Sequence, residues 1–168
     1  MTTGSSPIGI RAYDPADWPA VWAMLEPVFR AGETYAVPRD IGEQDAHRMW
    51  VELPRAVRVA VDAQGTLLGT YYLKANQAGP GNHVANCGYI VAAQARGLGV
   101  AGRMCEHSLG LARELGFSAM QYNLVVATNE VAVKLWQRHG FAIAGTLPRA
   151  FRHPVHGPVD AHVMYRLL

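Results

Sequence analysis

Runs of alternating and of helically spaced apolar residues divide the chain into strands and helices. Residues 8–13 alternate apolar and polar side chains, which predicts a first strand. The segment 14–32 follows an aspartate that can cap a helix, Asp14 or Asp17, and ends at Gly32. Its apolar residues recur at helical spacing, at Val21, Met24, Leu25 and Val28. These features predict a helix over 14–32, and a shorter helix is expected at 44–53.

The rest of the chain continues as strands with two helices between them. The dipeptide Gln64-Gly65 is a turn signal between two apolar runs and predicts an antiparallel hairpin. The predicted strands are 57–62, 67–75, 83–92, 119–126, 141–147 and 160–168, with a loop over 148–159 joining the last two. Helices are predicted at 100–116 and 128–139, with Gly116 and Gly140 as terminators. This order predicts an α+β fold with no repeats and no second domain.

Length and composition indicate one globular domain. The chain has 168 residues, of which 50% are apolar, and a formal net charge of +2. Residues 1–6 are small and polar and are expected to be a flexible N-terminus, followed by a single domain over 7–168. The basic residues are scattered, so no nucleic-acid-binding face is predicted.

The cysteines and the N-terminus favour a cytoplasmic protein. Cys87 and Cys105 lie in apolar contexts and are expected to be buried, reduced thiols. The first residues lack the basic and apolar regions of a secretory signal, and no apolar run has the roughly 20 residues of a membrane helix. We therefore expect neither secretion nor a membrane partner.

The segment RGLGVAGRM, residues 96–104, predicts a phosphate-binding helix start. Glycines before a helix N-terminus allow a phosphate to approach unpaired backbone N–H groups. Gly97, Gly99 and Gly102 also match the G-x-G-x-x-G pattern of dinucleotide sites. That interpretation fails on context, because residues 92–96 separate the strand from the first glycine and residues 119–126 contain no acidic residue.

Two blocks resemble the GNAT superfamily of acyl-CoA-dependent N-acetyltransferases. The block YIVAAQARGLGVAGRM is similar to the family's strand, loop and Arg-x-x-Gly-x-Gly/Ala pattern, with Arg96, Gly99 and Ala101 in the defining places. The block NEVAVKLWQRHGF resembles Asn-x-x-Ala-x-x-Leu-Tyr-x-x-x-Gly-Phe. The resemblance implies a mixed, mostly antiparallel sheet of seven strands. About four helices would flank this sheet, which would splay at its central parallel pair.

The resemblance also implies how acetyl-CoA is held. Backbone N–H groups around 97–101 would bind the pyrophosphate, and the backbone of 89–91 would bind the pantetheine arm. One N–H group there would polarise the thioester carbonyl. Asn129 would contact the pantetheine from the facing helix, as a helix cap, or both. The implied cofactor-binding residues are Tyr89, Val91, Arg96, Gly97, Leu98, Gly99, Val100, Ala101, Asn129 and Trp136.

The chain departs from the family where catalytic groups are expected. The family's tyrosine, taken to protonate the leaving CoA thiolate, is Trp136 here, and an indole has no ionisable hydroxyl. Trp136 either packs against the CoA arm or is a core aromatic residue. Water, Tyr89 or Tyr122 are the alternative proton donors. Asn86 takes the place of a strand glutamate and can position an amine or a water but cannot accept a proton.

Other candidate residues come from two predicted loops. Glu33 is the alternative general base, in the loop after the first helix where the family often builds its acceptor site. Tyr35 in the same loop is expected to line the acceptor pocket, together with His153 from the loop at 148–159. His153 and His156 lack a third ligand nearby, so no metal is predicted.

The implied activity is direct attack of a primary amine on acetyl-CoA, with a small-molecule amine as the expected acceptor. The alternative is an acyl-CoA-binding or regulatory module that has lost catalysis, which the missing tyrosine and glutamate favour. A nucleotide-binding oxidoreductase is a third, weaker hypothesis. Dimers are common in the family, so a homodimer is an alternative to a monomer.

Overall fold

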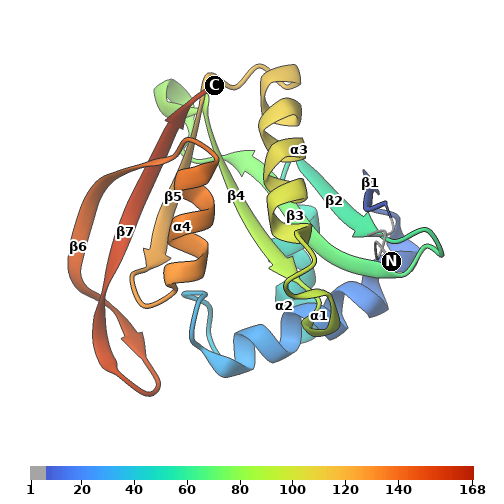
Figure 1. Ribbon diagram of the computed structural model, residues 1–168, viewed down its shortest axis with the longest axis horizontal. Helices are drawn as coiled ribbons and strands as arrows, with labels where there is room; N and C mark the ends of the chain where they lie inside the picture. The colour runs from blue at the N-terminus through green and yellow to red at the C-terminus, as the bar shows by residue number, and fades with distance from the viewer. Residues whose placement is uncertain (1–6) are drawn as a thin grey trace, which may run out of the picture.

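One mixed sheet of seven strands forms the centre of the protein, in the order β1-β2-β3-β4-β5-β7-β6. The computed structural model describes residues 7–168, so the predicted flexible N-terminus at 1–6 lies outside the described residues (Figure 1). Among the strands of residues 7–168, only β4 and β5 pair in parallel, and every other neighbouring pair is antiparallel. The strands are β1 (Gly9–Ala12), β2 (Ala56–Val61), β3 (Leu67–Ala75), β4 (Val84–Val91), β5 (Ala119–Val126), β6 (Ala142–His153) and β7 (Gly157–Leu167).

In the described part of the chain, four α-helices flank this sheet, which confirms the predicted α+β architecture. Figure 1 shows α3 and α4 in front of the sheet and α2 behind it. The helices are α1 (Trp18–Ala31), α2 (Glu43–His47), α3 (Val100–Glu114) and α4 (Glu130–Arg138). The helix predicted over 44–53 is α2 followed by a π-helical turn at Arg48–Glu52. One hydrophobic cluster packs between the sheet and α3, and a second packs between the sheet and α1 with α2.

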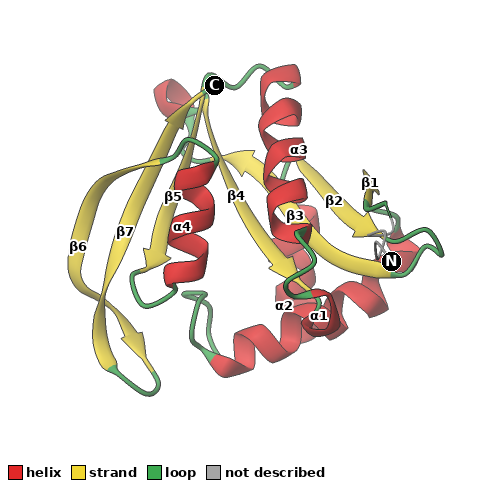
Figure 2. Cartoon of the chain, viewed as in Figure 1, coloured by secondary structure: helices red, strands yellow, loops and turns green. Residues whose placement is uncertain are grey.

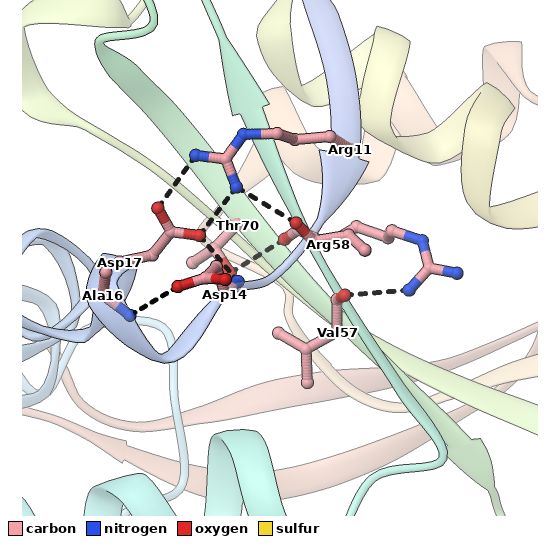
Figure 3. Close-up of polar contacts among 8 residues, drawn as sticks. Arg11, Asp14, Ala16, Asp17, Val57, Arg58 and Thr70 are labelled. Atoms are coloured by element: carbon pink, nitrogen blue, oxygen red, sulfur yellow. Dashed lines mark hydrogen bonds and ion pairs between the residues drawn. The ribbon is translucent and has the colours of Figure 1, made fainter.

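A capping network anchors the start of α1 to the edge of the sheet. Asp14 and Asp17 form a reciprocal capping box around a short 3₁₀ turn at Pro15–Asp17. Two guanidinium nitrogens of Arg11, in β1, donate to the Asp17 carboxylate at 2.7 and 2.8 Å (Figure 3). At the other end, Gly32 adopts a left-handed conformation with φ 66° and terminates the helix as predicted.

The predicted loop over 148–159 is wrong, because β6 and β7 form one long hairpin. β6 continues to His153, and β7 begins at Gly157. The sequence pattern failed at two prolines that the hairpin tolerates. Pro148 falls in the irregular segment between Leu147 and Phe151, on an edge strand. Pro158 lies before Ala161, where pairing with β5 begins, so β7 has one neighbour there.

Candidate functional site

The central feature of the sheet is a split between β4 and β5. Backbone pairing is confined to Val84 with Ala119 and Ala85 with Met120, although both strands continue well beyond these pairs. In Figure 2 the two strands start side by side and diverge toward their arrowheads. Each strand therefore turns an edge of backbone N–H and C=O groups into the split, where no neighbouring strand pairs with them.

The side chain of Asn86 lies at the closed end of the split, where β4 and β5 part, which we call the floor of the split. It lies directly after the last paired position of β4, and its amide donates to the backbone carbonyl of Gln121 in β5 at 3.0 Å. The Tyr72 hydroxyl donates to the Asn86 amide oxygen at 3.4 Å. Asn86 is buried, and both ends of its amide have partners. Its side chain links the two strands at the point where they part.

The pairing between β3 and β4 decides which backbone groups of β4 face the split. The Ala92 N–H donates to the Leu68 carbonyl, and the Asn76 N–H donates to the Val84 carbonyl, both at 2.8 Å. In an antiparallel ladder the backbone groups of successive residues point to opposite sides. The even-numbered residues of β4 therefore bond to β3, and the N–H groups of Cys87, Tyr89 and Val91 point into the split. The split thus contains a row of backbone donors at the predicted pantetheine-binding strand.

Tyr35 reaches this edge of β4 from the loop between α1 and α2. Its hydroxyl donates to the Tyr89 carbonyl at 2.8 Å, across a sequence separation of 54 residues. The ring packs edge-on against Phe29, with 5.7 Å between centroids, and lies 6.0 Å from the Trp50 ring. Burial raises the pKa of Tyr35 well above its ordinary value, so the phenol keeps its proton at neutral pH. Glu33, in the same loop, is exposed.

Aromatic side chains fill the α3 and α4 side of the split. The Trp136 ring, from α4, lies 5.0 Å from the Tyr89 ring and 5.1 Å from the Tyr122 ring. The Tyr89 hydroxyl meets the Tyr122 hydroxyl at 2.9 Å and the Ser108 hydroxyl, from α3, at 2.7 Å. Burial raises the pKa of both tyrosines well above the ordinary value. Trp136 is thus a core aromatic residue that spans both strands of the split.

The glycine-rich connection from β4 to α3 is open to solvent. Gly97 and Gly99 have φ angles of 79° and 80°, and nothing lies within 4 Å of a Cβ built on either. The first backbone N–H of α3 with a helical partner is that of Arg103, which donates to the Gly99 carbonyl at 3.1 Å. The preceding N–H groups, of Val100, Ala101 and Gly102, are therefore directed out of the helix start. The Val100 side chain is buried and anchors this turn, whereas Leu98 is exposed.

Arg96, which precedes these glycines, is exposed. Together with Gln94 it lines a groove of about 310 Å³ between α1 and the end of β4. Asn129 is the N-cap of α4, because its side-chain oxygen accepts from the Ala132 N–H at 3.3 Å. The helix-cap alternative for Asn129 is therefore confirmed.

His153 holds the turn at the tip of the β6–β7 hairpin. Its Nδ1 atom accepts from the backbone N–H groups of Val155 and His156 at 3.2 and 3.3 Å. The His153 and His156 rings stack at 4.6 Å. Within residues 7–168 no group of three His, Cys, Asp or Glu side chains is arranged to hold a metal ion. In the same part of the chain, no helix is long and apolar enough to cross a membrane.

Tyr72 and Gln121 also belong to the split, and neither was among the residues predicted for the site. Gln121 contributes a backbone carbonyl, which no side-chain pattern can indicate. Tyr72 covers Gly88, where an added Cβ would lie 2.5 Å from the Tyr72 ring. The alternation of side chains along β4 was the available signal for Tyr72. It places Asn86 and Gly88 on the face of the sheet opposite to α3, which is the face that Tyr72 covers.

Most of the chain matches the model of a known protein family. The acetyltransferase (GNAT) family model matches residues 18–141, which include the split and the glycine-rich connection. The chain belongs to the GNAT family. A curated relative, N-acetyltransferase aca1 of Schizosaccharomyces pombe, is 34% identical over 111 residues, which cover 66% of this chain and 53% of the relative. The chain thus spans about half the length of that relative.

Solved structures confirm the GNAT fold. A GCN5-related N-acetyltransferase from Kribbella flavida is 45% identical, with a TM-score of 0.92, and the match covers 96% of this chain and 98% of that one. A phosphinothricin acetyltransferase from Sinorhizobium meliloti, solved in complex with acetyl-CoA, has a TM-score of 0.84 at 19% identity. That match covers 96% of this chain and 88% of the other. The predicted resemblance and the splayed parallel pair are therefore confirmed.

Proposed function

We propose that this GNAT protein transfers an acetyl group from acetyl-CoA to the primary amine of a small molecule. The observation that carries the proposal is the continuity of two features along one strand. The split exposes the backbone edge of β4, and the same strand leads into the open glycine turn at the start of α3. A ligand with a diphosphate at one end and an amide-containing arm at the other fits this pairing of sites.

The glycine turn has the properties of a pyrophosphate site. A side chain at Gly97 or Gly99 would require a strained left-handed backbone, and the space beside both glycines is open. Free N–H groups and the positive end of the α3 dipole favour an anion there without a basic side chain. The proposed cofactor contacts on this turn are Arg96, Gly97, Leu98, Gly99, Val100 and Ala101.

The edge of β4 has the properties of a thioester site. The N–H groups of Tyr89 and Val91 point into the split, where they can bond to the pantetheine arm and polarise the acetyl carbonyl. Asn129 and Trp136 would flank the arm from α4. The bound thioester supplies the acetyl group, so the protein contributes position and carbonyl polarisation.

The amine would enter from the α1 and α2 face. On the opposite face the split is filled by Tyr89, Tyr122 and Trp136. Asn86 would orient the amine at the floor of the split, and Glu33, in the loop that carries Tyr35, would accept the amine proton.

His153, predicted to line the acceptor pocket, holds the tip of the β6–β7 hairpin and would act only at the rim of that pocket. The scattered, nearly neutral charge of the chain supports a small acceptor rather than a charged polymer.

Calorimetric binding of acetyl-CoA tests the proposal. Gly99→Glu places a carboxylate in the glycine turn and should abolish binding. Gly116→Glu is the matched control, because Gly116 lies just past the other end of α3 with φ 86° and open space around it. Loss in both variants, or no binding by the wild type, would overturn the proposal.

A measurement of turnover distinguishes an acetyltransferase from a non-catalytic acyl-CoA-binding module. A panel of small amines, followed by release of the CoA thiol, should identify at least one acceptor. Acetyl-CoA binding without turnover of any amine would instead support the acyl-CoA-binding or regulatory module.

A further inference from the structure

The proposed acetyl transfer would be helped by a proton donor beside the CoA sulfur. The family's tyrosine, which is taken to be this donor, is replaced by Trp136 in this chain. When the amine attacks, the C–S bond breaks and sulfur leaves as a thiolate. A group beside the sulfur can assist by donating a proton as the bond breaks. At position 136 an indole lies between two tyrosine rings, and an indole N–H is not an acid of useful strength.

The hydroxyls of Tyr89 and Tyr122 already take part in hydrogen bonds on the α3 side of the sheet. They bond to each other and to Ser108, a residue of α3 with no exposed surface. The Ser108 hydroxyl in turn donates to the Cys105 carbonyl at 2.7 Å within the same helix. These hydroxyls form a closed network under α3 and stabilise the packing of α3 on the sheet.

Tyr35 is placed differently, because its hydroxyl lies on the free edge of β4. The hydroxyl bonds to the Tyr89 carbonyl, which points into the split beside the Tyr89 N–H. In a bound thioester the carbonyl oxygen would accept from an N–H group on the free edge of β4. The sulfur, which is bonded to the carbonyl carbon, would then also lie next to Tyr89. The Tyr35 ring is held between Phe29 and Trp50, so the hydroxyl is preorganised at this position.

We propose that Tyr35 is the proton donor to the CoA thiolate in this protein, an inference that rests on the proposed acetyl transfer. The amine nitrogen forms a bond to the carbonyl carbon, the C–S bond breaks, and its electron pair leaves on sulfur. The phenol O–H of Tyr35, which donates to the Tyr89 carbonyl before the reaction, gives its proton to that sulfur. The proton released by the amine nitrogen restores the phenol through solvent, so the products are an amide and a neutral thiol.

This assignment explains how the chain tolerates Trp136. The donor comes from the α1–α2 loop on one face of the sheet, instead of from α4 on the other. Figure 1 shows this loop, in light blue, passing below the open ends of β4 and β5. The high pKa of Tyr35 keeps the phenol protonated at the pH of the reaction.

The test measures the acidity of the thiol of protein-bound CoA, by ultraviolet titration of its thiolate. A hydrogen bond from Tyr35 stabilises the thiolate, so Tyr35→Phe should raise the pKa of the bound thiol by about 1. Tyr13→Phe is the matched control, since Tyr13 follows β1, the edge strand that β2 and β3 separate from β4, and should leave the pKa of the bound thiol unchanged. CoA affinity within about threefold of wild type would show that the Tyr35→Phe site is intact.

Kinetics supply the second readout. Tyr35→Phe should lower kcat about 100-fold with little change in the KM for acetyl-CoA. Adding Trp136→Tyr to Tyr35→Phe restores a phenol at the family position and should recover part of the lost rate.

The outcomes distinguish the two proposals. Unchanged thiol acidity and unchanged kcat in Tyr35→Phe, with an active wild type, would overturn the assignment of Tyr35 alone. That assignment also fails if Tyr89→Phe or Tyr122→Phe moves the thiol pKa and Tyr35→Phe does not. No CoA binding or no turnover by the wild type would overturn the proposed acetyl transfer and this inference with it.

Discussion

The side-chain amide of Asn86 donates to the backbone carbonyl of Gln121 at 3.0 Å, directly beyond the last backbone pair between β4 and β5. A side chain thus takes over from the backbone ladder where the two parallel strands separate. Without this bond the Gln121 carbonyl would face the split with no partner in β4. The bond therefore marks the depth at which the split begins.

Removing the Asn86 amide should destabilise the protein. We expect Asn86→Ala to lower the free energy of unfolding by about 2 kcal/mol, because Asn86 is buried and its loss removes the bonds to the Gln121 carbonyl and the Tyr72 hydroxyl. Urea denaturation measures this loss. Asn123→Ala is the control, since Asn123 is exposed and bonds to Asn76 and Gln121 side chains; it should cost less than about 0.5 kcal/mol. Equal losses in the two variants would contradict the role of Asn86 at the floor.

The Asp17 carboxylate should stabilise the start of α1 in a pH-dependent manner. The Arg11 guanidinium lowers the pKa of Asp17 below its ordinary value, and the backbone N–H of Asp14 adds to the effect. A carboxyl with a lowered folded-state pKa stabilises the protein above its unfolded pKa of about 3.9 and loses that contribution as the pH falls through the folded pKa.

Asp17→Asn should therefore cost about 2 kcal/mol at pH 7, and the cost should shrink progressively below about pH 4. Denaturant unfolding of both proteins between pH 7 and pH 3 provides the measurement. Asp45→Asn, at an exposed position of α2, is the control and should have little effect at any pH in this range. A cost for Asp17→Asn that does not change with pH would show that the charge is not the stabilising feature.

The two cysteines should be inert in the folded protein. Burial raises the pKa of Cys87 to about 12 and that of Cys105 to about 11, so neither thiol ionises at pH 8. Reaction with Ellman's reagent at pH 8 should be slow in buffer and fast in denaturant, because the thiolate is the reactive form. Fast labelling of the native protein would contradict the burial of both thiols.

The same thiols should make the protein less stable in alkali. A thiol with a raised folded-state pKa favours the folded state fully below its unfolded pKa of about 8.5 and loses that contribution as the pH rises through the folded pKa. We expect Cys87→Ala with Cys105→Ala to flatten the fall in stability between about pH 9 and pH 12. An unchanged slope would assign the alkaline loss to the buried tyrosines instead.

Glu33 should matter for turnover and not for cofactor binding. If Glu33 accepts the amine proton, Glu33→Gln should lower kcat about 100-fold while acetyl-CoA binds as in the wild type. Asp40→Asn, an exposed position in the same loop, is the control and should retain full activity. Full activity of Glu33→Gln would leave proton removal to water.

The amino-acid sequence by itself determined the elements of the fold and the glycine turn. Alternating and helical apolar patterns located β5 at residues 119–126 and bounded α1 by an aspartate, Asp14 or Asp17, and by Gly32, because these are local properties of the backbone. Arg96 and Gly99 could be placed before a helix for the same reason. The prediction failed at residues 148–159, where Pro148 and Pro158 suggested a loop that pairing between β6 and β7 overrides.

Only the tertiary structure decided how distant segments meet in the split. The bond from Asn86 to Gln121 depends on where a parallel pairing stops, and no local pattern records that point. The contact of Tyr35 with the Tyr89 carbonyl joins a loop to a strand edge across 54 residues and depends on the packing of α1 against the sheet. Local physics therefore predicts the elements and the phosphate turn, whereas long-range packing places the groups that would carry out the chemistry.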